Sequence, residues 1–375
     1  MKRSKKRTLF KSGTMLPAAL VLAFTVFSYG QQNRSASDGD LHILPVRGNI
    51  YMLVGAGANV TLSVGSDGIL LVDTGSAQMT DKILTTIRQL ANAVSSMPIP
   101  ATTCVGPHCI GTSNPYGWSS PAINAIISTP APPKPIRYII NTSMDPDHTG
   151  GNEQIAKSGQ TFTGGNVTGT IGDSGEGADI IAHENVLVRM SGAAGKPATA
   201  PEGALPRDTY HLPSYKLSHF FNGEGVQIFN QPAAHTDGDS IVYFRYSDVI
   251  SAGDILMTTT YPVVDLEKGG SIQGIIDGLN RILDMSISEF RSQGGTMIIP
   301  GHGRLCDTGD VANYRNMVTI LRDRIQAMIK EGMTLQQVKA ARPTRDYDGR
   351  WGSTTGPWTT DMFVDAVYRS LSKRQ

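Results

Sequence analysis

Short apolar runs rich in β-branched residues, separated by turn residues, dominate the chain from Leu41 onward. The segments LHILPVRGNIYMLVGAG and NVTLSVGSDGILLVDTG contain such runs, which break at Arg47-Gly48 and Asp67-Gly68. These dipeptides are typical of tight turns, so the pattern predicts strands joined as hairpins. A helix is predicted next, from about Met79 to Ala93, because four apolar residues recur there at helical spacing. They are Ile83, Leu84, Ile87 and Leu90.

The same alternation of strand and helix patterns continues along the rest of the chain. PIRYIINTS over 135–143 predicts a strand, residues 177–189 a strand followed by a helix, and KLSHFFNGEGVQIFN a hairpin that turns at Asn222-Gly223. SIVYFRYS, DVISAGDIL and TMIIPGHG predict further strands. Helices are predicted from Gly274 to Gln293 and from Gly309 to Lys330. Two similar halves of this kind predict an α/β protein with two sheets packed face to face and helices outside, a four-layer αββα sandwich.

Two stretches without a hydrophobic period are predicted to be loop insertions. One is rich in Pro, Gly and Ser over about 95–135, and the other covers about 191–213. We therefore expect one αββα domain over 41–332, interrupted by these loops. A C-terminal helical extension over 333–375 is expected to pack on the same domain.

The first thirty residues have the pattern of a secretory signal peptide. A basic head precedes an apolar run from Met15 to Ser28, and Ser28-Tyr29-Gly30 offers small residues for cleavage. The run is shorter than the roughly 20 residues that a membrane-spanning helix needs, although an uncleaved anchor is the alternative. We expect a signal peptide over 1–30, a flexible segment over 31–40, and a secreted or periplasmic mature protein.

The charge of the mature chain argues against polyanionic partners. Six of the 33 basic residues lie in the signal segment, which has no acidic residue, so 27 basic residues face 32 acidic ones. A weakly acidic protein has no electrostatic basis for binding nucleic acid or an anionic membrane. We expect a small-molecule substrate, and no membrane contact once the signal is cleaved.

Three cysteines are present, and two of them lie close together. In an oxidising compartment we favour a disulfide between Cys104 and Cys109 of CVGPHC over a metal knuckle with His108, which lacks the further ligands of a closed zinc site. Cys306 is expected to be a partly buried thiol.

Candidate metal ligands stand where the predicted strands end. Asp145, Asp147 and His148 crowd into NTSMDPDHTGGN directly after a buried strand. Carboxylates so close together repel one another unless a cation compensates. His235, Asp254 and His302 each follow another apolar run, and ligands gather at the carboxyl ends of strands in α/β folds. A set of His and Asp ligands suits zinc, iron or manganese. Each residue alone is more typical of a turn or a core position, so the ordered series carries the prediction.

The ordered series resembles the metallo-β-lactamase superfamily, whose pattern is H-x-H-x-D-H, then His, then Asp or Cys, then His. The resemblance implies two divalent metal ions. It places Asp147, His148 and His302 at one metal and His235 at the other, with Asp254 as a bridge typical of the glyoxalase II and lactonase branches. The motifs in family order are VDTG at 72–75, DHTGGN at 147–152, AHENV at 182–186, HTDGD at 235–239, AGD at 252–254 and PGHG at 300–303.

The chain departs from this pattern at the first two histidines, where it has Ser143 and Asp145. Serine is a poor ligand, whereas Asp145 replaces a nitrogen ligand with an oxygen, as in the di-iron flavodiiron proteins. Three carboxylates then face two dications, which should weaken the Lewis acid and favour iron or manganese more than in the usual site. Zinc is still the first expectation, with iron or manganese as alternatives.

Three further residues have both a functional and a structural interpretation. Asp73 of VDTG, by the resemblance, lies beside the metals and orients a ligand, or it is a turn residue at a strand end. His183 of AHENV is expected to pack or to form hydrogen bonds, and Ser143 to lie beside the metals. The 95–135 insertion is expected to start on the face opposite the site and to serve structure or interaction.

The resemblance implies an enzyme, a metal-dependent hydrolase of a carbonyl-type bond such as an ester, thioester, lactone or β-lactam, and the signal-peptide pattern predicts that it is exported. A hydroxide activated by the metals and held by Asp147, the candidate catalytic residue, would attack the carbonyl. Two alternatives remain: a di-iron redox or oxygen-handling protein, and a binding protein with a degraded first metal site.

Overall fold

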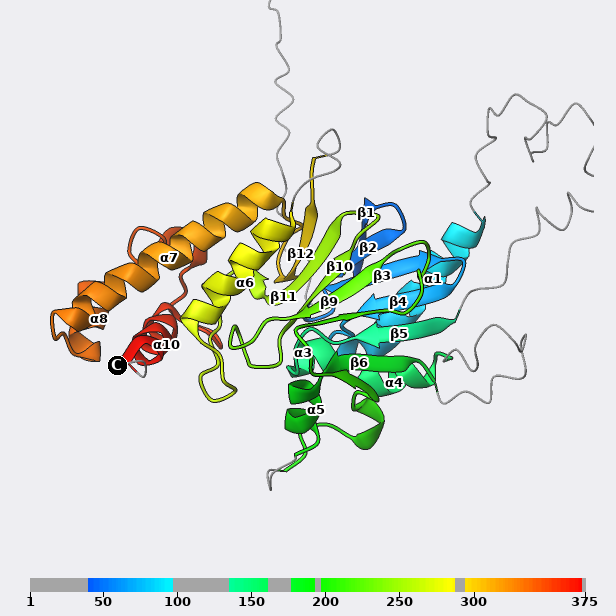
Figure 1. Cartoon of the computed structure of the whole chain (residues 1–375), viewed down its shortest axis with the longest axis horizontal. Coiled ribbons are helices and arrows are strands. Elements are labelled where there is room, and N and C mark those ends of the chain that lie inside the picture. The colour runs from blue at the N-terminus through cyan, green and yellow to red at the C-terminus, as the bar shows by residue number, and fades with distance from the viewer. Residues whose placement is uncertain (1–39, 97–134, 161–176, 193–196, 287–293, 373–375) are drawn as a thin grey trace, which may run out of the picture. The chain divides into compact units, whose positions relative to one another are not determined.

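The computed structural model describes residues 40–96, 135–160, 177–192, 197–286 and 294–372, which all lie in the compact unit Asp38–Gln375. Their strands form two mixed sheets with helices on both outer faces (Figure 1). The predicted α/β, four-layer αββα architecture is confirmed. Among the described helices, none is both long enough and apolar enough to cross a membrane.

The first sheet has seven strands in sequence order. Its antiparallel half holds β1 (His42–Arg47), β2 (Ile50–Val54), β3 (Val60–Gly65) and β4 (Gly68–Val72). Its parallel half continues from β4 with β5 (Ile136–Ile140), β6 (Asp179–His183) and β7 (Asp208–Tyr210). The predicted turns at Gly48 and Gly68 are present, and both glycines have a positive φ that a β-carbon would strain.

The second sheet has five strands in the order β12-β11-β10-β9-β8. They are β8 (Ser214–Lys216), β9 (Val226–Asn230), β10 (Ser240–Phe244), β11 (Val249–Met257) and β12 (Met297–His302). Only the β11–β12 pair is parallel. The predicted turn between β8 and β9 is confirmed, since Asn222 and Gly223 have φ values of 53° and 79°, as the tight primed turn requires.

Three apolar clusters separate the four layers. The central cluster joins the inner faces of both sheets, with Leu70 and Ile140 from the first and Val242 and Ile299 from the second. Outside the first sheet lie α1 (Thr80–Ser96) and α4 (Asn152–Lys157), and outside the second lie α6 (Ile272–Met285) and α7 (Thr308–Lys330). Central strands such as β4 and β11 are buried on both faces, so they read as continuous apolar runs.

Shorter helices and the C-terminal segment complete the described structure. Near the end of the first sheet lie η1 (Ala77–Met79), α3 (Pro146–Thr149), α5 (Glu184–Met190) and η2 (Glu202–Ala204). The C-terminal segment forms α8 (Leu335–Ala341), α9 (Asp348–Trp351) and α10 (Thr360–Ser372). In Figure 1, α8 and α10 lie beside α7, and α10 contacts α6, α7 and α8.

Two predicted boundaries are wrong. β7 lies inside the stretch predicted to be a loop over 191–213, because a strand of three residues is too short to show alternation and is held by pairing with β6. α6 ends at Met285 rather than at Gln293, since Ser286 caps it. The predicted signal segment, the Cys104–Cys109 pair and most of the 95–135 insertion lie outside the described residues.

Candidate metal centre

Four chain segments bring the six predicted ligands together at one edge of the sandwich. Asp145, Asp147 and His148 follow β5. Asp145 is the N-cap of α3, Pro146 begins the helix, and Asp147 and His148 lie within it. Proline suits this first position because its φ is already helical and its missing N–H has no partner there. The other three ligands come from the second sheet and its loops: His235 after β9, Asp254 within β11, and His302 at the end of β12.

The ligating atoms fall into two groups of three. In the first group, Asp147, His148 and His302 place them within 4.8 Å of one another. The Nε2 of His302 lies 3.1 Å from the Oδ2 of Asp147, and the rings of His148 and His302 meet edge to face at 5.8 Å. His148 is fully buried, whereas the other two are partly exposed, so the group is open to solvent on one side.

Asp145, His235 and Asp254 form the second group, again within 4.8 Å. The Nε2 of His235 lies 2.6 Å from the Oδ2 of Asp145 and 3.9 Å from the Oδ2 of Asp254. The Oδ1 of Asp254 faces the first group, 3.2 Å from His148 Nε2 and 3.6 Å from His302 Nε2. Asp254 therefore turns one carboxylate oxygen toward each group, as a bridging ligand must.

Unpartnered buried atoms show that the two groups fit metal ions. His148 Nε2 and Asp254 Oδ1 are buried and accept or donate no hydrogen bond within the described part of the chain. Buried polar atoms are almost always satisfied, so two such atoms that face each other indicate a missing cation. Imidazole and carboxylate ligands suit zinc, iron and manganese. The residues present are consistent with a binuclear metal site.

Hydrogen bonds from outside the two groups fix the buried imidazoles. Asp73 Oδ2 lies 2.8 Å from His148 Nδ1, and Asp73 Oδ1 accepts the backbone N–H of Thr142 at 2.8 Å. Asp73 has a φ of 63°, which is uncommon for residues other than glycine. Asp73 is therefore a turn residue and, at the same time, a hydrogen-bond partner of His148. The carbonyl of Val263 holds His235 Nδ1 in the same way, at 3.0 Å. Such contacts leave Nε2 as the ligating atom of both histidines.

Two other predicted residues lie outside both groups. Ser143 is buried, and its Oγ accepts the backbone N–H of Asp145 at 3.3 Å, so it shapes the turn that carries that ligand. His183 caps the start of α5, where its Nδ1 accepts the N–H of Asn185 at 3.2 Å, and its ring packs edge-on against Tyr210.

Lys268 is a residue of the site that the sequence did not reveal. Its Nζ lies 2.7 Å from Asp145 Oδ1 and 3.1 Å from Asp265 Oδ2. The ammonium offsets the charge of the carboxylate that stands in place of a histidine, while Asp145 Oδ2 remains turned toward His235. Nothing in the segment LEKGG signals this role, because the contact depends on the path of the loop after β11.

Mutual electrostatic stabilisation sets the pKa values of the group members. Burial alone would raise the pKa of Asp145 and of Asp254, but neighbouring cationic side chains hold both pKa values well below the usual range. Burial conversely lowers the pKa of His235 and His148. The facing carboxylates outweigh it, raising the pKa of His235 to about 10 and that of His148 well above its ordinary value.

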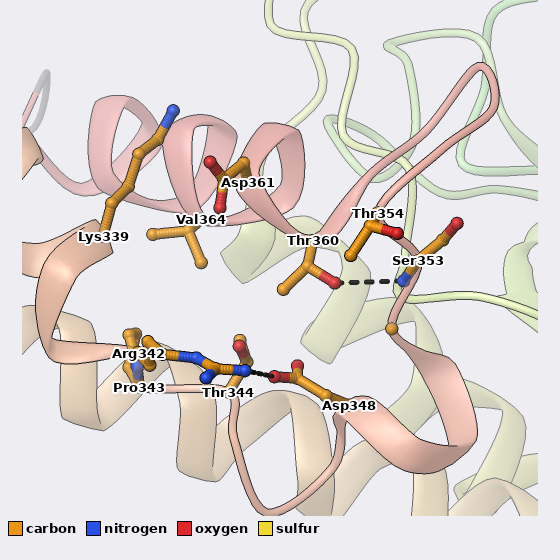
Figure 2. A pocket seen from close by; sticks show the side chains of 11 residues that line it. Lys339, Arg342, Pro343, Thr344, Asp348, Ser353, Thr354, Thr360, Asp361 and Val364 are labelled. Carbon is orange, nitrogen blue, oxygen red and sulfur yellow. Dashed lines mark hydrogen bonds and ion pairs between the residues drawn. The ribbon is translucent and has the colours of Figure 1, made fainter.

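A cavity of about 490 Å³ opens beside the two groups. Its described lining includes Asp145, Asp147 and Lys268, together with residues of η1, α3, α4, α5 and η2 and of the loop over 199–201. A second cavity, of about 430 Å³, lies in the C-terminal segment (Figure 2). An Arg342–Asp348 ion pair of 3.6 Å lies along its wall (Figure 2), and it includes no member of either group, so the first cavity is the candidate substrate site.

The fold and the site together define the class of protein. The family model of the metallo-beta-lactamase superfamily matches residues 53–302, which include all six candidate ligands. The chain belongs to this superfamily, as the ordered motifs indicated.

Solved structures share the fold at low sequence identity. The stereoselective inverting sec-alkylsulfatase Pisa1 from Pseudomonas sp. aligns with a TM-score of 0.53 and 15% identity, over 88% of this chain. The chain spans only 50% of the sulfatase's length. A metallo-beta-lactamase from Pontibacter korlensis aligns with a TM-score of 0.47 and 12% identity, covering 75% of this chain and 99% of that one. No curated protein sequence matches the chain.

Proposed function

We propose that the protein is an exported, metal-dependent hydrolase of carbonyl-type bonds: esters, thioesters, lactones or β-lactams. The observation that carries the proposal is the pair of His/Asp groups that share Asp254 at the edge of an open cavity. The superfamily consists largely of hydrolases, which supports this reaction class.

Each ligand has a distinct role in this proposal. Asp147, His148 and His302 hold one divalent ion, Asp145 and His235 hold the other, and Asp254 lies between them. When bound, the two ions supply Lewis-acid polarisation of the carbonyl and an activated water. Asp147 is the only member of the first group that lines the cavity, so its carboxylate is placed to orient the attacking water and accept its proton. Asp73 keeps His148 oriented for binding.

We propose zinc as the resident metal, with iron and manganese as the alternatives to test. Lys268 supports zinc, because it offsets the additional carboxylate charge that would otherwise favour a harder cation. Elemental analysis of protein purified without added metal tests this point. About two zinc ions per chain are expected. Two iron ions per chain without hydrolytic activity would favour a redox protein. One metal ion per chain, or none, would favour a binding protein.

A substrate panel tests the reaction class. It contains an aryl ester, a thioester, a lactone and a β-lactam, and also a secondary alkyl sulfate because a solved protein of the same fold is a sec-alkylsulfatase. His302→Ala should remove a metal and lower turnover at least a hundredfold. His183→Ala is the matched control, since His183 lies outside both groups. If the protein turns over only the sulfate, the proposed reaction class changes from carbonyl hydrolysis to sulfate-ester hydrolysis. If it turns over none of the compounds, the proposal is contradicted.

Export is a separate part of the proposal. The basic head and short apolar run of the first thirty residues support a mature protein that starts near Gln31. Intact-mass measurement of protein from a periplasmic fraction is expected to show those residues missing. Full-length protein in the cytoplasm would contradict it.

A further inference from the structure

We propose that the cavity beside Asp145 and Asp147 binds an uncharged aliphatic group of the substrate, so that neutral aliphatic esters or lactones are preferred over β-lactams. This inference rests on the proposed hydrolase function and names its substrate class. It is carried by the chemistry of the cavity wall, by the way the wall is held in place, and by the ion pairs of Lys268, the one cation in the described lining.

Aliphatic side chains and prolines form much of the described wall, beside a few uncharged polar residues. Met144, Pro146, Met190, Ala200, Pro201 and Ala204 all line the cavity. Among the described lining residues none is aromatic, so this part of the wall offers no flat face for stacking a sugar or an aryl group. Two methionines provide a soft, adaptable surface that suits a flexible chain. The volume of about 490 Å³ lies within the ordinary range for small-molecule sites.

The wall is anchored to the sheet and is therefore preformed. Met190 belongs to a small apolar cluster with Ala182 and Val186, against which Met144 and Ala200 pack. Backbone hydrogen bonding holds the loop to α5, because the N–H of Thr199 donates to the carbonyl of Met190 at 2.9 Å. The amide of Asn152 donates to the carbonyl of Ala204 at 2.9 Å and holds η2. A preformed apolar pocket gains binding energy without an ordering cost.

Charge at the cavity argues against a carboxylate on the bound group. Lys268 is the one cationic residue in the described lining, and its ammonium already contacts Asp145 and Asp265. Glu153 and the two ligand carboxylates add negative charge at the same cavity. A substrate carboxylate would have to displace one of the lysine's contacts, which disfavours β-lactams, whose ring system bears such a group.

The chain-length dependence of turnover and of binding tests the proposal. 4-Nitrophenyl esters from acetate to hexanoate, corrected for their uncatalysed hydrolysis, should show kcat/KM rising about two- to fourfold per methylene. Hydroxamic acids of the same chain lengths should show the same trend in Kd by calorimetry, whether or not any ester is turned over. An ester should also exceed a β-lactam in kcat/KM.

Narrowing the cavity should remove the trend. Ala200→Phe is expected to lower the hexanoate-to-acetate ratio at least tenfold, and Ala200→Leu, a smaller change, keeps the test if the phenylalanine variant does not fold. Val188→Phe is the matched control, because Val188 is exposed on α5 and lies outside the cavity. The proposal would be overturned if neither kcat/KM nor Kd changed with chain length, or if the hexanoate-to-acetate ratio were unchanged in both Ala200 variants. Neither result would contradict the proposed hydrolase function. If hydroxamate affinity rises with chain length but no ester is turned over, the proposed aliphatic pocket is supported and the proposed hydrolase function is contradicted.

Discussion

The carboxylate at position 145, which stands in place of a histidine, changes the charge balance of the second ligand group. A carboxylate there adds negative charge to the second ligand group, and the ammonium of Lys268 lies 2.7 Å from its Oδ1. At an effective dielectric constant of 20, two unit charges 4 Å apart interact by about 4 kcal/mol, so this contact is large enough to alter metal affinity. The weaker Lewis acid expected from the sequence is therefore offset in part by the lysine.

The first prediction concerns Lys268 and metal affinity. In Lys268→Met the ammonium no longer competes for Asp145 or repels a bound dication, so affinity at the second group should rise about tenfold or more. Lys268→Arg keeps the charge and should bind metal nearly as the unaltered protein does. Titration against a metal-sensitive dye measures both. Loss of metal from the methionine variant would instead show that the lysine mainly holds Asp145 in place.

Metal binding is also predicted to release protons. Carboxylates raise the pKa of His235 to about 10 and that of His148 well above its ordinary value, so both imidazoles carry a proton at pH 7.5 in the metal-free protein. A ligating imidazole must be neutral, so filling both sites should release about two protons, and affinity should increase with pH up to about 10. Calorimetry in two buffers of different ionisation enthalpy counts the protons. A buffer-independent enthalpy would show that the histidines are already neutral.

The sequence revealed the ligand types but not the residues that control them. Asp145, Asp147 and His148 stand together in one motif, and the apolar run before each of the other ligands marks a strand end. Lys268 and the carbonyl of Val263 act through a loop whose path depends on tertiary packing. Residue type and spacing carry no information about such contacts.

At the scale of elements, Asn222 links the turns of the two sheets. In the β8–β9 turn its side chain accepts the N–H of Asp67 at 2.9 Å and donates to Ser63 Oγ at 3.1 Å and to the carbonyl of Gly68 at 3.0 Å. The dipeptide Asn222-Gly223 predicted the turn because both residues tolerate a positive φ. The link to the β3–β4 turn was not predictable, since the partners lie about 150 residues away in sequence.

Asn222→Ala is predicted to destabilise the protein by roughly 3 kcal/mol, from three hydrogen bonds of about 1 kcal/mol each, reduced by solvation, and a strained left-handed alanine. Asn222→Gly loses the same hydrogen bonds but adopts the conformation freely, so it should be about 1 kcal/mol more stable than the alanine variant. Urea unfolding of the three proteins gives both differences. An alanine variant as stable as the glycine variant would show that the backbone conformation costs nothing there.

Periodicity predicted the long elements and failed for the short ones. The apolar positions of α1 recur over about two turns, and all four predicted residues, Ile83, Leu84, Ile87 and Leu90, are buried. β7 has three residues and exists because β6 offers an open edge for pairing. Such elements are set by their neighbours rather than by their own pattern.

For the whole molecule, the C-terminal segment is part of the same core as the second sheet. Val338, Trp351, Phe363 and Val367 are buried in one cluster with residues of α6 and α7. Phe363 stacks on Tyr261 with ring centroids 4.7 Å apart, and the Tyr261 hydroxyl donates to Asp348 Oδ1 at 3.0 Å. Tyr261 lies in the loop between β11 and α6 that also carries Val263 and Lys268, so the C-terminal segment contacts the loop that holds the second ligand group.

The last prediction follows from this contact. Phe363→Ala should destabilise the protein by about 3–5 kcal/mol, as deletion of a buried aromatic ring usually does. Because the ring holds Tyr261 in place, the variant should also bind metal less tightly at the second group while the first group is little affected. Met362→Ala is the matched control, since Met362 is 43% exposed and its loss should cost less than about 0.5 kcal/mol. Two-step metal titration and urea unfolding decide the matter. A variant that is destabilised but keeps both affinities would show that the C-terminal segment stabilises the fold without positioning the site.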